Sequence, residues 1–161
     1  MNAEEFEPMI RQLIGNRCWR ITAGRITGSR MNLDFGDRIK TEVGKDRRID
    51  EFGVFGLQIG NAQWRITDQA GRVMATSLDL LDRSAPAGIG ITQLRDRLVE
   101  SVFIHNRFFD LTIVFEGNWE LAVFCNDSEE PAENYAFSEI QKYYTVRCID
   151  KRLEVSVSDC G

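Results

Sequence analysis

The sequence predicts an α+β fold of two similar halves, each with one helix packed on antiparallel strands. Two segments, 4–14 and 92–101, place apolar residues at the three- and four-residue spacing of a helix with one buried face. Much of the remaining chain alternates apolar and polar residues in short runs between turn residues, as half-buried antiparallel strands do. The third observation is a correspondence between residues 31–78 and 111–158.

The corresponding segments lie about 80 residues apart: Met31–Asp37 with Leu111–Gly117, Trp64–Ile66 with Tyr144–Val146, and Val73 and Ala75 with Leu153 and Val155. The excess of shared apolar positions over random placement is small. Two explanations are therefore open: a tandem duplication that shares one core, or the strand–turn–strand period of any antiparallel α+β domain. We expect one globular domain, 1–161, with halves 1–82 and 91–161 joined by a linker at 83–90.

The first half begins with the helix at Glu4–Ile14, whose early glutamates suit the positive end of the helix dipole. Gly15 and Asn16 supply its end. The expected strands that follow are 18–23, a longer strand from 25 or 26 to 35, 39–43 after a turn at Gly36-Asp37, 52–59 with a glycine bulge, and a hairpin of 63–67 with 72–80. The charged run 44–48 is expected to be a solvated loop or, as the alternative, a phosphate-binding patch.

The second half follows the linker 83–90, where proline, glycines and small residues break helices and strands. Thr92 has the position of an N-cap for a helix that continues to about Ser101. The expected strands are 103–104, 109–115, 119–125, 134–137, 142–149 and 153–157, with a hairpin turn at 116–118 and an acidic loop at 127–133.

Composition and charge restrict the functional classes. The chain is 43% hydrophobic and 28% charged, with a net charge of −5 and a pI near 5.0. A polyanion such as nucleic acid or an anionic membrane would be repelled by the average surface, so a basic partner fits better. The four cysteines show no CxxC spacing, and Met1–Glu5 lacks the features of a signal peptide. We expect reduced thiols, no membrane span and a cytoplasmic location.

Catalytic patterns are missing from the sequence. His105 is the only histidine, which excludes a histidine-based metal cluster and requires that any catalytic triad use this residue. Gly88-Ile89-Gly90 lacks the third glycine of a dinucleotide fingerprint, and there is neither a P-loop nor a GxSxG elbow. The sequence therefore predicts no catalytic residues, no metal and no cofactor.

The most distinctive surface feature is the acidic loop. It predicts a partner-binding site made of Asp127, Glu129, Glu130, Glu133, Asn134 and Tyr135. Such a cluster of carboxylates would attract a cationic protein and speed the encounter, with Tyr135 and Trp119 as aromatic anchors. The alternative is a solubilising loop over a sheet edge. We expect the protein to act as a monomer or a homodimer.

A family resemblance follows from Leu13–Trp19 and the strand that ends at Leu33–Gly36. The second copy repeats the pattern from Leu98-Val99 to Glu133–Tyr135, with Glu100 where the glycine would stand. This arrangement resembles small bacterial α+β proteins, of immunity or uncharacterised type, found beside polymorphic or contact-dependent toxins. The resemblance implies an immunity protein that binds a cognate toxin and blocks its active site. The net charge, the acidic loop and the missing catalytic residues predict that this toxin is a basic domain such as a nuclease.

Two other functions are weighed beside this one. The first is a module that binds a small molecule or peptide in the cleft between the halves, which a pocket lined by arginines and aromatic residues would favour. The second is an enzyme, which would require His105 to lie in a cleft against a carboxylate.

Overall fold

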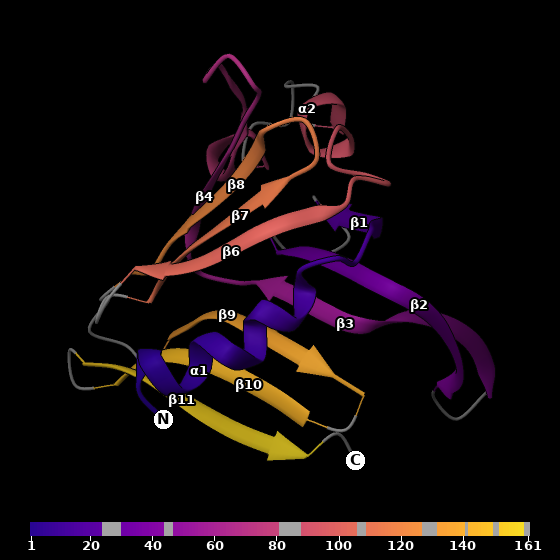
Figure 1. The fold of residues 1–161 in the computed structure, drawn as a ribbon. Coiled ribbons are helices and arrows are strands. Elements are labelled where there is room, and N and C mark those ends of the chain that lie inside the picture. The colour runs from indigo at the N-terminus through magenta and orange to yellow at the C-terminus, as the bar shows by residue number, and fades with distance from the viewer. Residues whose placement is uncertain are drawn as a thin grey trace.

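The computed structural model describes residues 1–23, 30–43, 47–80, 88–105, 109–126, 132–140, 142–149 and 152–159. They form two antiparallel sheets that enclose a shared apolar core, and one helix lies across an open side between the sheets (Figure 1). The architecture is mostly β. The predicted α+β fold, with a helix on the strands of each half, is therefore wrong.

The six-stranded sheet has the order β1 (Cys18–Ala23), β2 (Met31–Val43), β3 (Arg48–Ile59), β9 (Ala132–Glu139), β10 (Lys142–Ile149) and β11 (Arg152–Asp159). The five-stranded sheet has the order β5 (Val73–Thr76), β4 (Gln63–Thr67), β8 (Trp119–Phe124), β7 (Asp110–Phe115) and β6 (Val99–His105). The helical segments within the described ranges are α1 (Ala3–Ile10), α2 (Gly88–Thr92) and the 3₁₀ turns Arg11–Leu13 and Ser77–Leu80.

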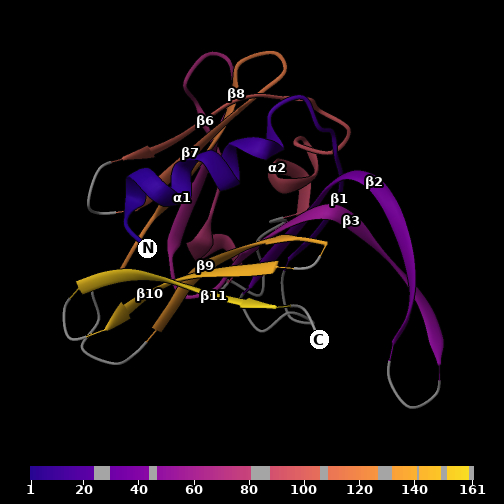
Figure 2. The same cartoon turned by 60° about the horizontal axis from the view of Figure 1, so that its bottom comes forward.

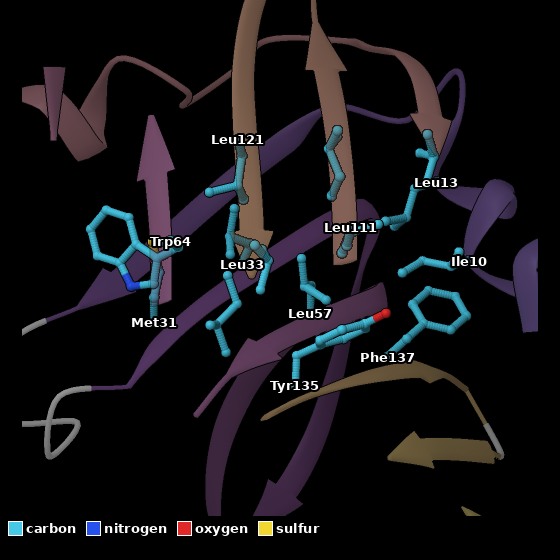
Figure 3. Packing of buried hydrophobic residues seen from close by; sticks show 14 of the residues in the cluster. Ile10, Leu13, Met31, Leu33, Leu57, Trp64, Leu111, Leu121, Tyr135 and Phe137 are labelled. Carbon is cyan, nitrogen blue, oxygen red and sulfur yellow. The ribbon is translucent and has the colours of Figure 1, made fainter. Parts of the chain in front are cut away.

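Helix α1 starts where the sequence predicts a helix. Asn2 caps it through a reciprocal pair of bonds with Glu5, because the Asn2 side chain accepts from the Glu5 N–H and the Glu5 carboxylate accepts from the Asn2 N–H. Phe6 and Ile10 are fully buried, and the Phe6 ring lies 6.3 Å from the ring of Tyr135. Figure 3 shows Ile10 entering the same core as residues from both sheets. The helix thus closes one side of the core.

The predicted helix at 92–101 is the main local error. Helix α2 ends at Thr92, and β6 begins at Val99. A bulge between Val99 and Ser101 turns both Val99 and Val102 towards the core. The helix is predicted from the four-residue spacing of Leu94, Leu98 and Val102, but Leu94 lies in a turn, Leu98 in a bridge with Arg17 and Val102 in β6.

Strand β2 also differs from the prediction, because the chain does not turn at Gly36-Asp37. The strand continues through a bulge opposite β3, and Gly36 supplies the positive φ of 74°. Strands β1 and β9 accompany β2 and β3 only as far as Phe35 and Phe55, so the distal parts of β2 and β3 project as a two-stranded arm (Figure 2). Residues 44–46 of the charged run lie outside the described residues, and Arg48 already belongs to β3.

The two halves of the chain interleave across both sheets. Strands β1–β3 belong to the six-stranded sheet and β4–β5 to the other, whereas β6–β8 belong to the five-stranded sheet and β9–β11 to the first. The two sets of strands, β1–β5 and β6–β11, correspond in detail. An antiparallel bridge joins Arg17 to Leu98. The Arg17 carbonyl accepts from the Gly36 N–H at 3.1 Å, and the Leu98 carbonyl accepts from the Glu116 N–H at 2.8 Å.

This arrangement decides which sequence matches are structural. Phe35 and Phe115 stack across the core with ring centres 6.5 Å apart, so the match of Met31–Asp37 with Leu111–Gly117 is one of equivalent position. The match of Trp64 with Tyr144 does not join equivalent positions. Trp64 of β4 pairs with Val123 of β8, and the corresponding pair in the other half is Tyr135 of β9 with Ile59 of β3.

Residues 83–87 of the predicted linker lie outside the described residues, and residues 88–90, where no helix was expected, begin α2. None of the helices in the described ranges has the length and apolar character needed to cross a membrane.

Candidate functional site

The structure describes only three of the six residues predicted to bind a partner. Asp127, Glu129 and Glu130 lie outside the described residues. The Glu133 carboxylate lies 3.8 Å from the Arg147 guanidinium, and its side chain is 26% exposed. The other two predicted residues, Asn134 and Tyr135, are fully buried and have no surface to offer a partner. For these two residues the prediction is wrong.

The burial of Asn134 and Tyr135 has a local cause. Asn134 is the extra residue of a bulge in β9, and its side chain accepts from the Asn126 N–H at 2.7 Å and donates to the Asn126 carbonyl at 3.2 Å. The Tyr135 hydroxyl donates to the Phe109 carbonyl at 2.9 Å. Burial raises the pKa of the Tyr135 phenol well above its usual value. Both side chains therefore satisfy backbone groups of the fold.

His105 does not meet the condition set for a catalytic base. Its side chain is exposed, and Nε2 lies 2.9 Å from the Thr112 hydroxyl oxygen. Over the described ranges, no group of three or more histidine, cysteine, aspartate or glutamate side chains is placed to hold a metal ion.

A hollow of about 290 Å³ lies on the face of the six-stranded sheet that is turned away from the core. We call it the outer groove. Figure 2 shows that the sheet is strongly curved and that the arm bends away from the five-stranded sheet, so this face is concave. The groove is lined by Arg20, Thr22, Asn32, Leu33, Asp34, Phe52, Gly56, Leu57, Gln58, Ala136, Ser138 and Tyr143.

Strand register brings the groove together from both ends of the sequence. One row of paired positions crosses the sheet as Thr22, Asn32, Gln58 and Ala136, and the next as Arg20, Asp34, Gly56, Ser138 and Tyr143. The alternate residues of the same strands, such as Leu33, face the core. The first row ends in the small residue Ala136, the second has Gly56 and Ser138 side by side, and a Cβ added at Gly56 would lie 2.6 Å from the Ser138 hydroxyl oxygen. The missing side-chain volume forms the hollow.

Two amide side chains on neighbouring strands differ in their hydrogen bonding. Gln58 Oε1 accepts from the Tyr143 hydroxyl at 2.6 Å. Asn32 Oδ1 is buried and has no hydrogen-bond partner in the part of the chain that the structure describes. A buried acceptor without a donor costs about 1–3 kcal/mol, so such atoms are rare in native proteins. One residue that lines the outer groove therefore carries an acceptor that none of the described groups satisfies.

The charges that line the groove neutralise one another. Arg20 Nε lies 2.7 Å from Asp34 Oδ2, and Asp34 Oδ1 accepts from the Gly53 N–H at 3.0 Å. Asp34 is only 8% exposed. A second carboxylate, that of Asp50, lies 3.7 Å from the Arg20 guanidinium. Arg20 is thus committed to carboxylates of the protein and leaves no surplus of positive charge for an anionic ligand.

Aromatic rings border the charged end of the groove. The Arg20 guanidinium lies over the rings of Trp19 and Phe52, at 5.0 and 5.4 Å from their centres. Arg38 stacks on the Trp19 ring as well, at 4.6 Å. Phe52 lines the groove and is 38% exposed. These contacts fix Arg20 and leave an apolar rim beside the polar floor.

Sequence reasoning missed this site, although a signal for it is present. The outward positions of β1, β2 and β3 include uncharged polar residues such as Thr22, Asn32 and Gln58 rather than the lysine and glutamate usual on a solvated sheet face. Recognising them as one site requires the register of five strands. Comparison of the chain with protein-family models, with curated proteins and with solved structures found no match.

Proposed function

We propose that the protein is a non-catalytic binding module that holds a small, uncharged polar ligand in the outer groove. The observation that carries the proposal is that Asn32, which lines this concave surface, has a buried Oδ1 without a partner among the described residues. A ligand that donates a hydrogen bond to this atom removes the cost of leaving it unpaired. The free energy of binding would then include the removal of this cost, which the free protein already carries.

The size and the charge of the groove support the same class of ligand. Its volume of about 290 Å³ is at the lower end of the range for small-molecule sites. The ion pair of Arg20 and Asp34 leaves the lining without net charge. A charged ligand would have to enter without a free counter-charge, whereas a neutral ligand needs only hydrogen-bond partners.

This function belongs to the class that the sequence offered as its alternative, a small-molecule or peptide-binding module. Arginine and aromatic residues line the groove, and this was the feature expected to favour that alternative. The location differs, because the groove lies on one sheet and not in a cleft between halves. Cys18 is a buried free thiol, which supports a reducing compartment such as the cytoplasm.

Neutralisation of a toxin by the acidic loop stays a prediction. Purified protein with charge reversals at Glu129, Glu130 and Glu133 tests it against a cognate toxin domain, and unchanged binding would place the interface elsewhere.

The binding proposal is tested with a library of neutral polar compounds in ligand-observed NMR. The Ser138→Leu variant fills the hollow over Gly56, and Ser156→Leu is its matched control, because Ser156 is exposed on β11 of the same sheet and does not line the groove. We expect at least one compound to bind the wild type and Ser156→Leu with equal affinity. Its affinity for folded Ser138→Leu should be at least tenfold lower. Equal binding to all three proteins would overturn the proposal.

A further inference from the structure

The polar groups of the outer groove are spread over a wide area. Asn32, Gln58 and Ser138 lie on three successive strands, and neighbouring strands are about 4.8 Å apart. A ligand that used all three would present polar atoms across roughly 10 Å and in more than one direction. An amide presents its polar atoms along one edge, and a nucleobase presents them only in the plane of its flat ring. A sugar ring presents hydroxyls around its whole perimeter and fits this spread.

The hydrogen-bonding groups that line the outer groove also favour a sugar. An asparagine amide accepts with its oxygen and donates with its nitrogen, and a hydroxyl both donates and accepts. The Asn32 amide is therefore complementary to two adjacent hydroxyls, of which one donates to Oδ1 and the other accepts from Nδ2. The hydroxyls of Thr22 and Ser138 line the same groove and can exchange either role with a ligand hydroxyl.

The rim of the groove suits the apolar face of a sugar. Phe52 lines the groove with part of its ring exposed, and the Arg20 guanidinium lies over this ring. A ring held in this way offers a fixed surface for the C–H groups of a pyranose. Gly56 lies four residues along β3 from Phe52, and Tyr143 lies two strands across from Gly56, so Phe52 and Tyr143 are roughly 16 Å apart. Two rings so far apart cannot hold a flat base between them.

We propose that the ligand of the outer groove is an uncharged carbohydrate of one or two rings, which donates a hydroxyl hydrogen bond to Asn32 Oδ1 and rests its C–H face on Phe52. This inference rests on the proposed binding function. The neutral pair of Arg20 and Asp34 excludes phosphorylated and acidic sugars as the preferred class.

The test is a titration by NMR with uncharged sugars: glucose, galactose, mannose, N-acetylglucosamine, maltose and cellobiose. Neutral nucleosides and blocked dipeptides are the competing classes. We expect saturable binding of at least one sugar, and at least tenfold weaker binding by Asn32→Leu. The matched control is Gln63→Leu, because Gln63 is an exposed amide on β4 of the other sheet, and its affinity should equal that of the wild type.

Deoxy analogues of the bound sugar then locate the contact. Removing the hydroxyl that meets Asn32 should weaken binding by the wild type at least tenfold and should have no further effect in Asn32→Leu. A sugar whose affinity is unchanged by Asn32→Leu and Ser138→Leu would overturn the placement. Groove-dependent binding of a nucleoside or dipeptide, without any sugar, would overturn the carbohydrate but keep the binding module. No binding in any class would overturn both.

Discussion

Replacement of Asn32 by leucine should stabilise the free protein. The side chains of Asn32 and leucine are similar in size, and the substitution removes a buried acceptor that has no partner among the described residues. In the unfolded chain water satisfies this oxygen, whereas in the folded chain nothing does. Leucine removes that difference and is at least as compatible with a central strand as asparagine.

The magnitude follows from the cost of the unpaired atom. A buried polar group without a partner costs about 1–3 kcal/mol. Asn32 is only partly buried as a residue, so the lower half of this range applies, and we expect the free energy of unfolding to rise by about 1–2 kcal/mol. For a chain of this size the melting temperature should rise by roughly 2–8 °C.

The assay is urea unfolding followed by tryptophan fluorescence, with the denaturant slope compared between variants. The matched control is Gln58→Leu on the neighbouring strand, which removes the acceptor of the Tyr143 hydroxyl and should lower the free energy of unfolding by about 1 kcal/mol. The reasoning is refuted if Asn32→Leu destabilises the protein by more than about 1 kcal/mol with an unchanged slope, since the amide would then have a partner within the fold.

Three further outcomes are expected. Tyr135→Phe removes the donor to the Phe109 carbonyl and should lower the free energy of unfolding by about 1–3 kcal/mol; a loss below a few tenths would mean that water replaces it. Burial raises the pKa of the Cys18 thiol and of the Tyr135 phenol. Between the unfolded and the folded pKa values only the unfolded chain releases these protons, so the free energy of unfolding should fall as the pH rises above about 8.5. Urea midpoints that stay constant up to about pH 10.5 would contradict this. The backbone N–H of Arg72 donates to the Asp68 carboxylate and holds the pKa of this carboxyl below its usual value. The ionised carboxylate therefore stabilises the turn at 68–72 above about pH 4, and the turn should loosen as the pH falls further. The measurement is the NMR chemical shift of the Arg72 amide, and an equal pH dependence of this shift in Asp68→Asn would contradict the prediction.

Part of the candidate site could have been read from the sequence, and part could not. Polar residues such as Asn32 and Gln58 stand at alternate positions of strands, which marks them as outward-facing. The hollow between them depends on Gly56 facing Ser138, and these residues lie on strands that pair across a long stretch of chain. The predicted residue Asn134 is polar but buried at a bulge that sequence alternation does not reveal, and Tyr135 faces the core in the regular register of β9.

By itself the sequence determined the features that depend on neighbouring residues. The start of α1, the β1 strand and the hairpins of β7–β8 and β10–β11 follow from caps, alternation and turn residues within short windows. Only the tertiary structure decided that Val99–His105 is a strand, that β3 pairs with β9, and that the two halves interleave. The physical reason is that strand pairing and bulges are selected by burial against a distant partner, which local propensity does not encode. The outer groove exists because of those distant pairings.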